Sequence, residues 1–288
     1  MLNERQMSIL TYITEHGEAK NTALQSLIGD CSMMTLWRDL TKLEQEGRII
    51  RVRGGAIAAQ SPMAGQEANF TCRAKQNVSA KEDIARIAAD LVYPGHAYYL
   101  DAGSTILTLT YFLHEGSYTV VTSAANTAAE LAQKNRYNIT LLGGQVSGVT
   151  LSCSGPQAEQ MLDGMNIDVA IMAASGYSFN GGFTSGSLQE AQLKQRVIRK
   201  AACTMMLMDC GKIGRSHPFT FASLDDVDVL VGDSMLTPEF VREAEAHNVR
   251  VFSVNDGVYL AGFVISDGKQ YRNGYCFPSL YERKRKMV

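Results

Sequence analysis

Residues 32–56 read SMMTLWRDLTKLEQEGRIIRVRGGA, and this stretch decides how the first part of the chain is expected to fold. Ser32 precedes a run in which Leu36, Leu40 and Leu43 recur at helical spacing, so we predict a helix with Ser32 as its N-cap. Residues 48–56 then alternate well enough for a strand and end on a Gly-Gly pair, which is typical of a turn. The stretch therefore predicts one helix followed by a short β-ribbon.

Two further helices are expected upstream of this stretch. Met7, Leu10 and Ile13 are spaced for a helix that ends near residue 17, and NTALQSLIG at residues 21–29 suits a second, shorter helix. Three short helices within fewer than about 50 residues are typical of a helix-turn-helix. The β-ribbon would then be a wing, and the third helix would be the one that enters a DNA groove.

The third helix has an outer face that suits this role. Each residue of a helix advances by about 100°. Met33 is therefore expected on the apolar side with the leucines, Met34 and Arg38 on the opposite side, Thr35 and Thr41 on the shoulders, and Trp37 at the boundary. Only a few residues near the N-terminal end of a recognition helix reach base edges. An ordinary solvated helix face is the alternative.

The expected wing is basic. Three arginines fall within six residues, beside a glycine pair that permits close approach to a phosphate backbone. Over residues 1–60 the positive and negative charges cancel, and the whole chain has a net charge of -2, so the basic character lies in the position of these arginines. The candidate DNA contacts are Ser32, Met34, Thr35, Trp37, Arg38, Arg48, Arg51, Arg53, Gly54 and Gly55.

Composition excludes several other classes. The six cysteines form no C-x-x-C pair and have no histidine at metal-ligand spacing, so we expect no metal site and no disulfide framework. No cofactor is expected either. The N-terminus lacks the apolar segment of a secretory signal, and no segment approaches the roughly 18 apolar residues of a membrane span. We therefore expect a cytoplasmic protein without membrane contact.

Residues 32–56 resemble the N-terminal domain of the DeoR family of bacterial sugar-metabolism regulators, whose usual form is S-x-x-T-[I/L]-R-R-D-L-x-x-L-E-x-x-G-x-[I/L]-x-R-x-H-G-G-A. Twelve residues carry the match. They are Ser32, Thr35, Arg38, Asp39, Leu40, Leu43, Glu44, Gly47, Arg51, Gly54, Gly55 and Ala56.

This sequence departs from the family form at two positions. Trp37 replaces the first arginine, and an indole cannot make the bidentate guanine contact that is worth about 1–3 kcal/mol of discrimination. Arg53 replaces the histidine, which exchanges a titratable group for a permanent charge that favours phosphate contact. The family's usual base contacts are therefore not carried over at Trp37.

Three parts are expected along the chain: residues 1–57 as the winged helix-turn-helix domain, a polar linker over residues 58–80, and a larger domain over residues 81–288. Beyond Lys81, apolar runs alternate with amphipathic helices, which favours a Rossmann-like α/β fold with a mainly parallel sheet. In such folds ligands bind beyond the carboxyl ends of the strands.

The loop DAGST at residues 101–105 is the first of these strand ends. Asp101 ends a strand, Gly103 permits close approach, and Ser104 and Thr105 lie at a helix N-terminus, which together favour an anion site, most simply for phosphate. Plain N-capping is the alternative. The mononucleotide and dinucleotide glycine motifs are both missing, so ATP and NAD are not indicated. Other strand ends and the helix after residue 187 add Ser123, Asn126, Gly144, Ser175, Gly176, Lys194, Asp209 and Lys212.

The segments VVTSAAN, LLGG, DVAIMAASG and MDCGK make this region resemble the DeoR-family effector domain, which is similar in fold to ribose-5-phosphate isomerase and to CoA transferases. The resemblance implies a site for a phosphorylated sugar, with the phosphate near residues 103–105 and sugar hydroxyls near Asp209 and Lys212. The isomerase carries paired carboxylates after the strand that here reads DVAIMAASGY. Residues 173–176 offer no such general base.

We therefore predict a transcriptional repressor of a carbohydrate-metabolism operon that binds double-stranded operator DNA, has no catalytic residues, and is released by a phosphorylated sugar. Paired half-sites favour a homo-oligomer, either a dimer or a tetramer. Two alternatives remain open: a sugar-phosphate isomerase or transferase-like enzyme with a helical N-terminal extension, because Asp101 and Asp209 remain, and an activator with the same parts.

Overall fold

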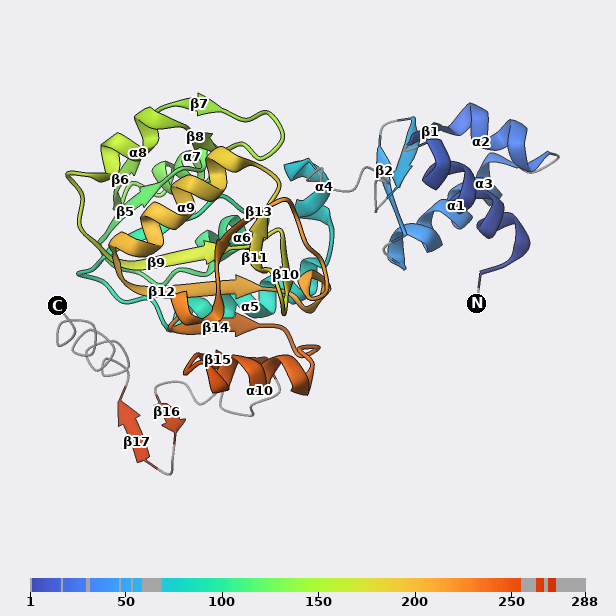
Figure 1. Cartoon of the computed structure of the whole chain (residues 1–288). Coiled ribbons are helices and arrows are strands. Elements are labelled where there is room, and N and C mark those ends of the chain that lie inside the picture. The colour runs from blue at the N-terminus through green and yellow to red at the C-terminus, as the bar shows by residue number, and fades with distance from the viewer. Residues whose placement is uncertain are drawn as a thin grey trace. The chain divides into compact units, whose positions relative to one another are not determined.

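The structure is a computed structural model that describes residues 2–16, 18–29, 32–46, 48–52, 54–58, 69–254, 263–266 and 269–272. The chain forms two compact units, Met1–Ala68 and Asn69–Val288 (Figure 1). The predictions made for Arg53 and for residues 59–68 of the expected linker lie outside the described residues.

The described residues of the first unit form three helices and a small antiparallel sheet. The helices are α1 (Glu4–His16), α2 (Asn21–Ile28) and α3 (Met33–Gln45). The sheet has the order β1-β3-β2, with β1 at Glu18–Lys20, β2 at Ile49–Val52 and β3 at Gly55–Ala58. The three expected helices and the β-ribbon are confirmed, whereas β1 was not expected. Its sequence, EAK, has no apolar alternation, and it becomes a strand by pairing with β3.

A buried carboxylate joins α1 to α3. Asp39 accepts hydrogen bonds from Arg5 Nε at 2.5 Å and from Gln6 Nε2 at 2.8 Å. Burial raises the pKa of Asp39, but these two hydrogen bonds and the positive charge of Arg5 outweigh it and hold the pKa below its usual value. The bonds fix the rotation of α3, because Asp39 lies beside the leucines at positions 36, 40 and 43, which are buried in the core of this unit.

The second unit is built on a seven-stranded parallel sheet with the order β15-β14-β12-β9-β4-β5-β6. This confirms the expected α/β fold. In sheet order the strands are β15 (Arg250–Phe252), β14 (Val229–Gly232), β12 (Ala201–Met208), β9 (Ile167–Ala173), β4 (Ala97–Leu100), β5 (Tyr118–Thr122) and β6 (Tyr137–Leu141).

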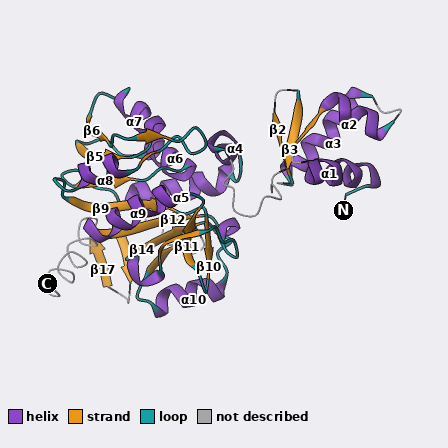
Figure 2. Cartoon of the chain, turned by 45° about the horizontal axis from the view of Figure 1, so that its top comes forward, coloured by secondary structure: helices purple, strands orange, loops and turns teal. Residues whose placement is uncertain are grey.

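Helices cover both faces of this sheet (Figure 2). One core lies against α5 (Val78–Asp90), α6 (Ser104–Phe112) and α7 (Ala125–Ala132). The other lies against α8 (Pro156–Leu162), α9 (Leu188–Lys200) and α10 (Pro238–Ala246). In β4, Tyr98 and Leu100 face the first core and Tyr99 faces the second, as the alternation of side chains in a strand requires.

Smaller elements complete the unit. A three-stranded antiparallel sheet joins β10 (Gly176–Ser178), β11 (Gly182–Ser185) and β13 (Phe219–Ala222). Two hairpin-like pairs are β7 (Gln145–Val146) with β8 (Cys153–Ser154), and β16 (Phe263–Ser266) with β17 (Lys269–Arg272). Short 3-10 turns lie at Cys210–Lys212 and Leu224–Asp226.

Helix α4 (Phe70–Lys75) precedes α5 at the start of the second unit. Residues 69–80, which were expected to belong to the linker, thus form α4 and the first residues of α5. The backbone N–H of Phe70 donates to the carbonyl of Val149 at 2.7 Å, which attaches α4 to the rest of the unit. Within the described residues no helix has the length and apolar character needed to cross a membrane.

The order of the strands determines where a ligand can enter. Strand β4 is the first of the sheet along the chain; β5 and β6 follow on one side of it, whereas β9, β12, β14 and β15 lie on the other. The loops after β4 and β9 therefore diverge and leave a crevice at the carboxyl ends of these neighbouring strands, the topological switch point of an open α/β sheet.

Candidate functional site

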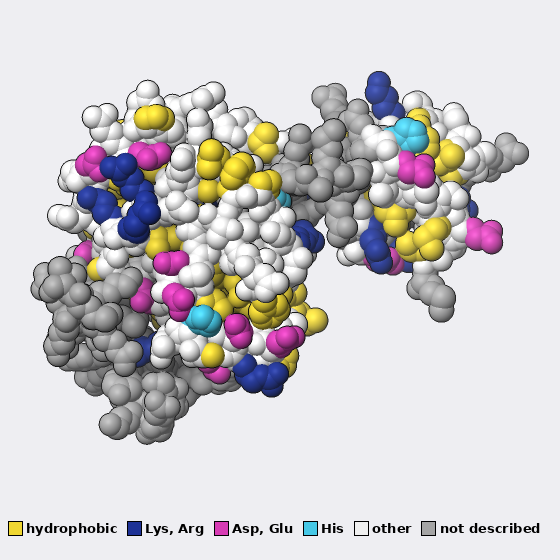
Figure 3. Space-filling view, viewed as in Figure 1, with side chains coloured by type: hydrophobic (Ala, Val, Ile, Leu, Met, Phe, Trp, Pro, Cys, Tyr) yellow, Lys and Arg dark blue, Asp and Glu magenta, His cyan; other side chains and the backbone are white. Residues whose placement is uncertain are grey.

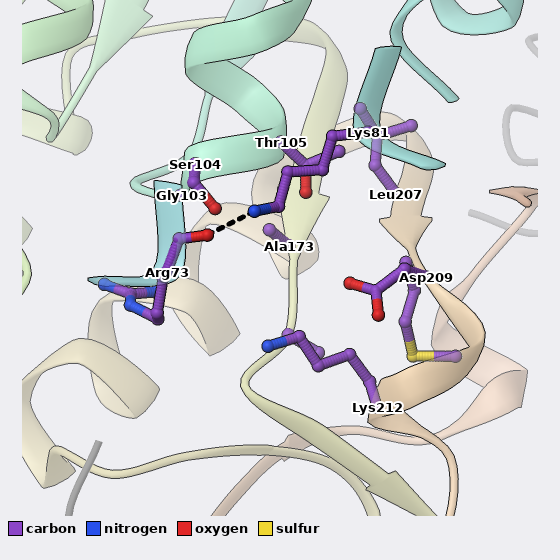
Figure 4. A pocket seen from close by; sticks show the side chains of 11 residues that line it. Arg73, Lys81, Gly103, Ser104, Thr105, Ala173, Leu207, Asp209 and Lys212 are labelled. Carbon is purple, nitrogen blue, oxygen red and sulfur yellow. Dashed lines mark hydrogen bonds between the residues drawn. The ribbon is translucent and has the colours of Figure 1, made fainter. Parts of the chain in front are cut away.

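A pocket lies at this switch point (Figure 4). It is formed by the ends of β9 and β12, the start of α6, and residues of α4 and α5. The lining residues are Arg73, Lys81, Gly103, Ser104, Thr105, Ala173, Ala174, Leu207, Met208, Asp209 and Lys212. The structure thus brings together five of the predicted effector contacts, at positions 103, 104, 105, 209 and 212.

The N-terminus of α6 forms one wall of the pocket. Gly103 is its N-cap, and no side chain caps the first turn, although Ser104 and Thr105 are both at hand. The first backbone N–H groups and the positive end of the helix dipole thus suit an anion, whereas plain N-capping by Ser104 or Thr105 is not seen. A Cβ at Gly103 would lie 3.0 Å from the Ala173 Cβ. Glycine at this position therefore lets the loop after β4 pass close to the end of β9.

Three cationic side chains line the same pocket: Arg73 from α4, Lys81 from α5, and Lys212 from the turn after β12. Lys81 is 4% exposed, and its ammonium donates hydrogen bonds to the backbone carbonyls of Arg73 and Gln76 (Figure 4 shows the first of these). Burial lowers the pKa of Lys81 to about 8; Asp209 opposes this shift, and the charges of Lys212 and Arg73 add to it. The pocket therefore combines a helix N-terminus with a concentration of positive charge.

Asp209 is the carboxylate among the described residues that line the pocket. Its Oδ1 accepts hydrogen bonds from Asn77 Nδ2 at 2.9 Å and from the backbone N–H of Gly211 at 3.1 Å. The carboxylate is therefore held in one orientation from two sides. A hydrogen-bond acceptor of this kind suits a hydroxyl group of a ligand.

Two predicted effector contacts lie beneath the pocket wall. Asp101 and Lys194 form an ion pair in which both side chains are more than nine-tenths buried. Lys194 also donates to the carbonyl of Ala173 at 2.8 Å, and the N–H of Ala173 donates to Asp101 at 3.0 Å. Neither side chain is among the residues that line the pocket. Their bonds join β4, β9 and α9, and so hold Ala173 in the wall.

The remaining predicted effector contacts are not brought to this pocket. Ser123 accepts a hydrogen bond from the Tyr99 hydroxyl at 2.9 Å within the core. The others are Asn126, Gly144, Ser175 and Gly176, which follow or begin other strands and helices of the unit. Ser123 and Asn126 follow β5, Gly144 follows β6, and Ser175 and Gly176 follow β9, but none of the five lines the pocket.

Sequence reasoning missed Arg73 and Lys81. Lys81 had a signal, because it shares a helix face with the buried residues Ile84, Ala85 and Ala88, where a lysine is out of place unless it has partners. Arg73 had none, since its segment is polar and was assigned to the linker.

On the first unit, α3 presents the expected outer face. Ser32 is its N-cap, with Oγ accepting from the N–H of Thr35 at 3.2 Å, as predicted. Met34 is 69% exposed and Trp37 is 51% exposed, and Arg38 is exposed beside them. Met33, which was expected on the apolar side, is 41% exposed because it lies in the first turn, before the buried leucines begin. Hydrophobic and basic side chains lie side by side on the surface of this unit (Figure 3).

The wing strand β2 is docked on α3 through Arg51. The Arg51 guanidinium carbon lies 4.1 Å from the centre of the Trp37 ring, and Nη1 donates to Thr41 Oγ1 at 3.0 Å. The backbone N–H of Arg51 donates to Glu44 Oε1 at 3.1 Å. Trp37 and Arg51, both predicted DNA contacts, are therefore in contact with each other.

The other predicted wing residues have separate roles. Arg48 is exposed just before β2. Gly54 has a φ of +86° in the turn between β2 and β3, a conformation that favours glycine. A Cβ at Gly55 would lie 2.2 Å from the carbonyl oxygen of Ala19, so this glycine is required for the pairing of β1 with β3. Its predicted approach to a phosphate backbone is a separate expectation.

A winged helix-turn-helix unit followed by an α/β unit with an anion-suited pocket defines a two-part DNA-binding regulator. The sequence matches the family model of the DeoR-like helix-turn-helix domain over residues 5–62, and that of the DeoR C terminal sensor domain over residues 76–234. The chain belongs to the DeoR family of transcriptional regulators.

Each of three relatives matches more than four-fifths of this chain. The chain is 30% identical to the uncharacterized HTH-type transcriptional regulator YulB of Bacillus subtilis strain 168, over 88% of this chain and 97% of the relative. It is also 30% identical to the HTH-type transcriptional repressor GlcR of the same organism, over 82% and 90%. The L-fucose operon activator of Haemophilus influenzae is 27% identical, over 86% and 98%.

Proposed function

We propose that this chain is a repressor of a carbohydrate-metabolism operon that leaves its operator when a phosphorylated sugar occupies the pocket of the second unit. The name of GlcR supports repression, and that of the L-fucose operon activator supports a link to sugar metabolism. A repressor of this kind requires a ligand that binds the DNA-incompetent state more tightly. Typical coupling of about 1–3 kcal/mol would change DNA affinity by roughly 5- to 150-fold.

The single observation that carries the ligand assignment is the meeting of three cations with the uncapped N-terminus of α6. A phosphate dianion matches this arrangement in charge and in its need for several N–H donors. Asp209, which accepts a hydrogen bond from Asn77, would accept another from a sugar hydroxyl. The pocket thus favours a small phosphorylated polyol over an uncharged sugar.

The pocket is expected to bind its ligand without turning it over. The end of β9 contributes Ala173 and Ala174 to the pocket, and neither can act as a general base. Asp209 is the carboxylate that remains, and its Oδ1 already accepts two hydrogen bonds. The alternative, an isomerase or transferase, predicts steady turnover of a pentose or hexose phosphate that is abolished by Asp209→Asn.

We further propose that the chain acts as a homo-oligomer, because helix-turn-helix proteins read paired half-sites with two copies of the same unit. A dimer requires one pair of half-sites, and a tetramer can hold two. Sedimentation of the full chain with and without operator DNA distinguishes these states.

Thermal unfolding of the full chain with a panel of sugar phosphates tests the ligand assignment, with each unphosphorylated sugar as its control. A ligand at 100 times its Kd adds about 2.7 kcal/mol to the free energy of unfolding. Lys212→Met should remove this effect, whereas Lys200→Met, on α9 and outside the pocket, should retain it. A panel in which no sugar phosphate raises the Tm, or in which the unphosphorylated sugars act equally, would contradict the assignment.

A reporter gene under the regulated promoter tests the sign of regulation. We expect transcription to rise when the gene for this chain is deleted and to fall when it is restored. In the restored strain, transcription should rise in the presence of the effector. Loss of transcription on deletion would instead identify an activator, which would retain the same two sites.

A further inference from the structure

The outer face of α3 carries two large exposed hydrophobic side chains, Met34 and Trp37, where it is expected to meet DNA. Met34, Trp37, Arg38 and Thr41 follow at helical spacing and share this face. Arg38 is the arginine of this face, and its guanidinium makes no hydrogen bond or ion pair with another described residue. The exposed area next to it belongs to the thioether of Met34 and the indole of Trp37.

The contact with Arg51 restricts what Trp37 can do. The Arg51 guanidinium, at 4.1 Å from the ring centre, covers one face of the indole, and its hydrogen bond to Thr41 Oγ1 holds it there. Thr41 Oγ1 in turn donates to the carbonyl of Trp37 at 2.7 Å, so the three residues form a closed set of contacts. The covered face cannot stack on a base or sugar, which leaves the exposed remainder of the ring.

The major groove offers few features that an apolar surface can match. Purine N7 and O6 require a donor and the amino groups of adenine and cytosine require an acceptor, whereas the methionine thioether has no donor and is only a weak acceptor. The C5-methyl group of thymine is the feature that gains from apolar contact. Hydrogen-bonding groups placed against Met34 would lose water without a partner, which is unfavourable.

We propose that the face of α3 formed by Met34 and Trp37 reads thymine C5-methyl groups, and that Trp37 also positions Arg51 for the phosphate backbone. This inference rests on the proposed function, because it requires operator DNA. It makes Trp37 a specificity-determining residue and Arg51 a sequence-independent contact, and it leaves Arg38 as the charged residue of this face that is available to a base edge.

Replacement of thymine by deoxyuridine tests the proposal, since it removes only the methyl group. The full chain is first used to select binding sites from random double-stranded DNA. Each thymine of the selected duplex is then replaced in turn, and Kd is measured at fixed salt. We expect at least one position at which binding weakens about fourfold per methyl, the change that corresponds to about 0.8 kcal/mol for a buried CH₂ group.

Variants separate reading by α3 from other causes. Met34→Ala, at an exposed position, should lose the deoxyuridine effect, and Trp37→Phe should retain most of it. Trp37→Arg should shift selection towards guanine at one base pair. Met7→Ala, an exposed methionine on α1, is the matched control and should leave the effect unchanged.

The outcomes distinguish this inference from the proposed function. A selected duplex that is bound equally well with every thymine replaced would overturn methyl reading while leaving DNA binding intact. An effect that persists unchanged in Met34→Ala and Trp37→Arg would also overturn it, because the methyl contact would then lie elsewhere. Selection of no duplex would refute the proposed function itself, and this inference with it.

Discussion

Removal of the Lys194 ammonium should destabilise the second unit strongly. In Lys194→Met the aliphatic part of the side chain is kept, but Asp101 loses its charged partner in a site where it is 1% exposed. Its carboxylate would retain the N–H of Ala173 as a donor. A buried charge that has lost its partner typically costs about 3–5 kcal/mol of unfolding free energy.

The size of the change follows from the structure. For a unit of this length each kcal/mol corresponds to about 2–4 °C in Tm, so we expect a fall of about 10 °C. Adding Asp101→Asn should recover part of this loss, because an asparagine can still accept from Ala173 and carries no charge. The double variant should thus be more stable than Lys194→Met alone.

Calorimetry or denaturant unfolding of the full chain measures both variants. Arg199→Met, an exposed position on the same helix, serves as the control and should shift Tm by little. A fall in Tm of less than about 2 °C for Lys194→Met would refute the reasoning, since it is smaller than the value of a single kcal/mol. So would a double variant that is less stable than the single one.

Three other predictions concern different parts of the chain. The pKa of Lys81 is about 8 in the folded chain and near 10.5 in the unfolded chain, so the unfolded state binds more protons between these pH values. The free energy of unfolding should therefore rise with pH in this window by about 3 kcal/mol relative to Lys81→Met, as measured by denaturant titration. Parallel pH profiles of the two proteins would contradict this. The pKa of Asp39 is lowered in the folded chain, so its contribution to the free energy of unfolding is present above about pH 4 and is lost as the pH falls through the folded-state pKa. Asp39→Asn should therefore lower the free energy of unfolding by about 1.5–3 kcal/mol at neutral pH and flatten the acid unfolding curve. A variant as stable as the parent would count against the hydrogen bonds from Arg5 and Gln6. Arg51→Ala should weaken binding to all duplexes alike and reduce the slope of log K against log salt by about 1, whereas an unchanged slope would exclude a phosphate contact.

The first unit was predictable because its signals are local. The N-cap serine and the spacing of the three leucines lie within twelve residues, and the hairpin follows at once. Strand β1 was not predictable, because three residues become a strand only by pairing with β3, more than thirty residues later in the chain. The alternation of strands and helices in the second unit was likewise visible, since each element carries its own periodicity.

The pocket was predictable only in part, for a physical reason. Residues 103–105 and Asp209 follow strands directly, so the rule for parallel sheets places them correctly. Asp101 and Lys194 have the same chemistry whether they face a ligand or each other, and only the packing of α9 against the sheet decides between the two. Arg73 and Lys81 enter the pocket from helices that precede the sheet, and no rule about strand ends includes them.

The two carbonyl bonds of Lys81 have a consequence for the start of the second unit. An ammonium group has three N–H bonds, and two of those of Lys81 hold the backbone at Arg73 and Gln76, where α4 ends. An anion in the pocket has one remaining donor to share, or it displaces a carbonyl. Ligand and backbone thus compete for the same three hydrogens, and this competition takes place four to seven residues after Asn69, where the second unit begins.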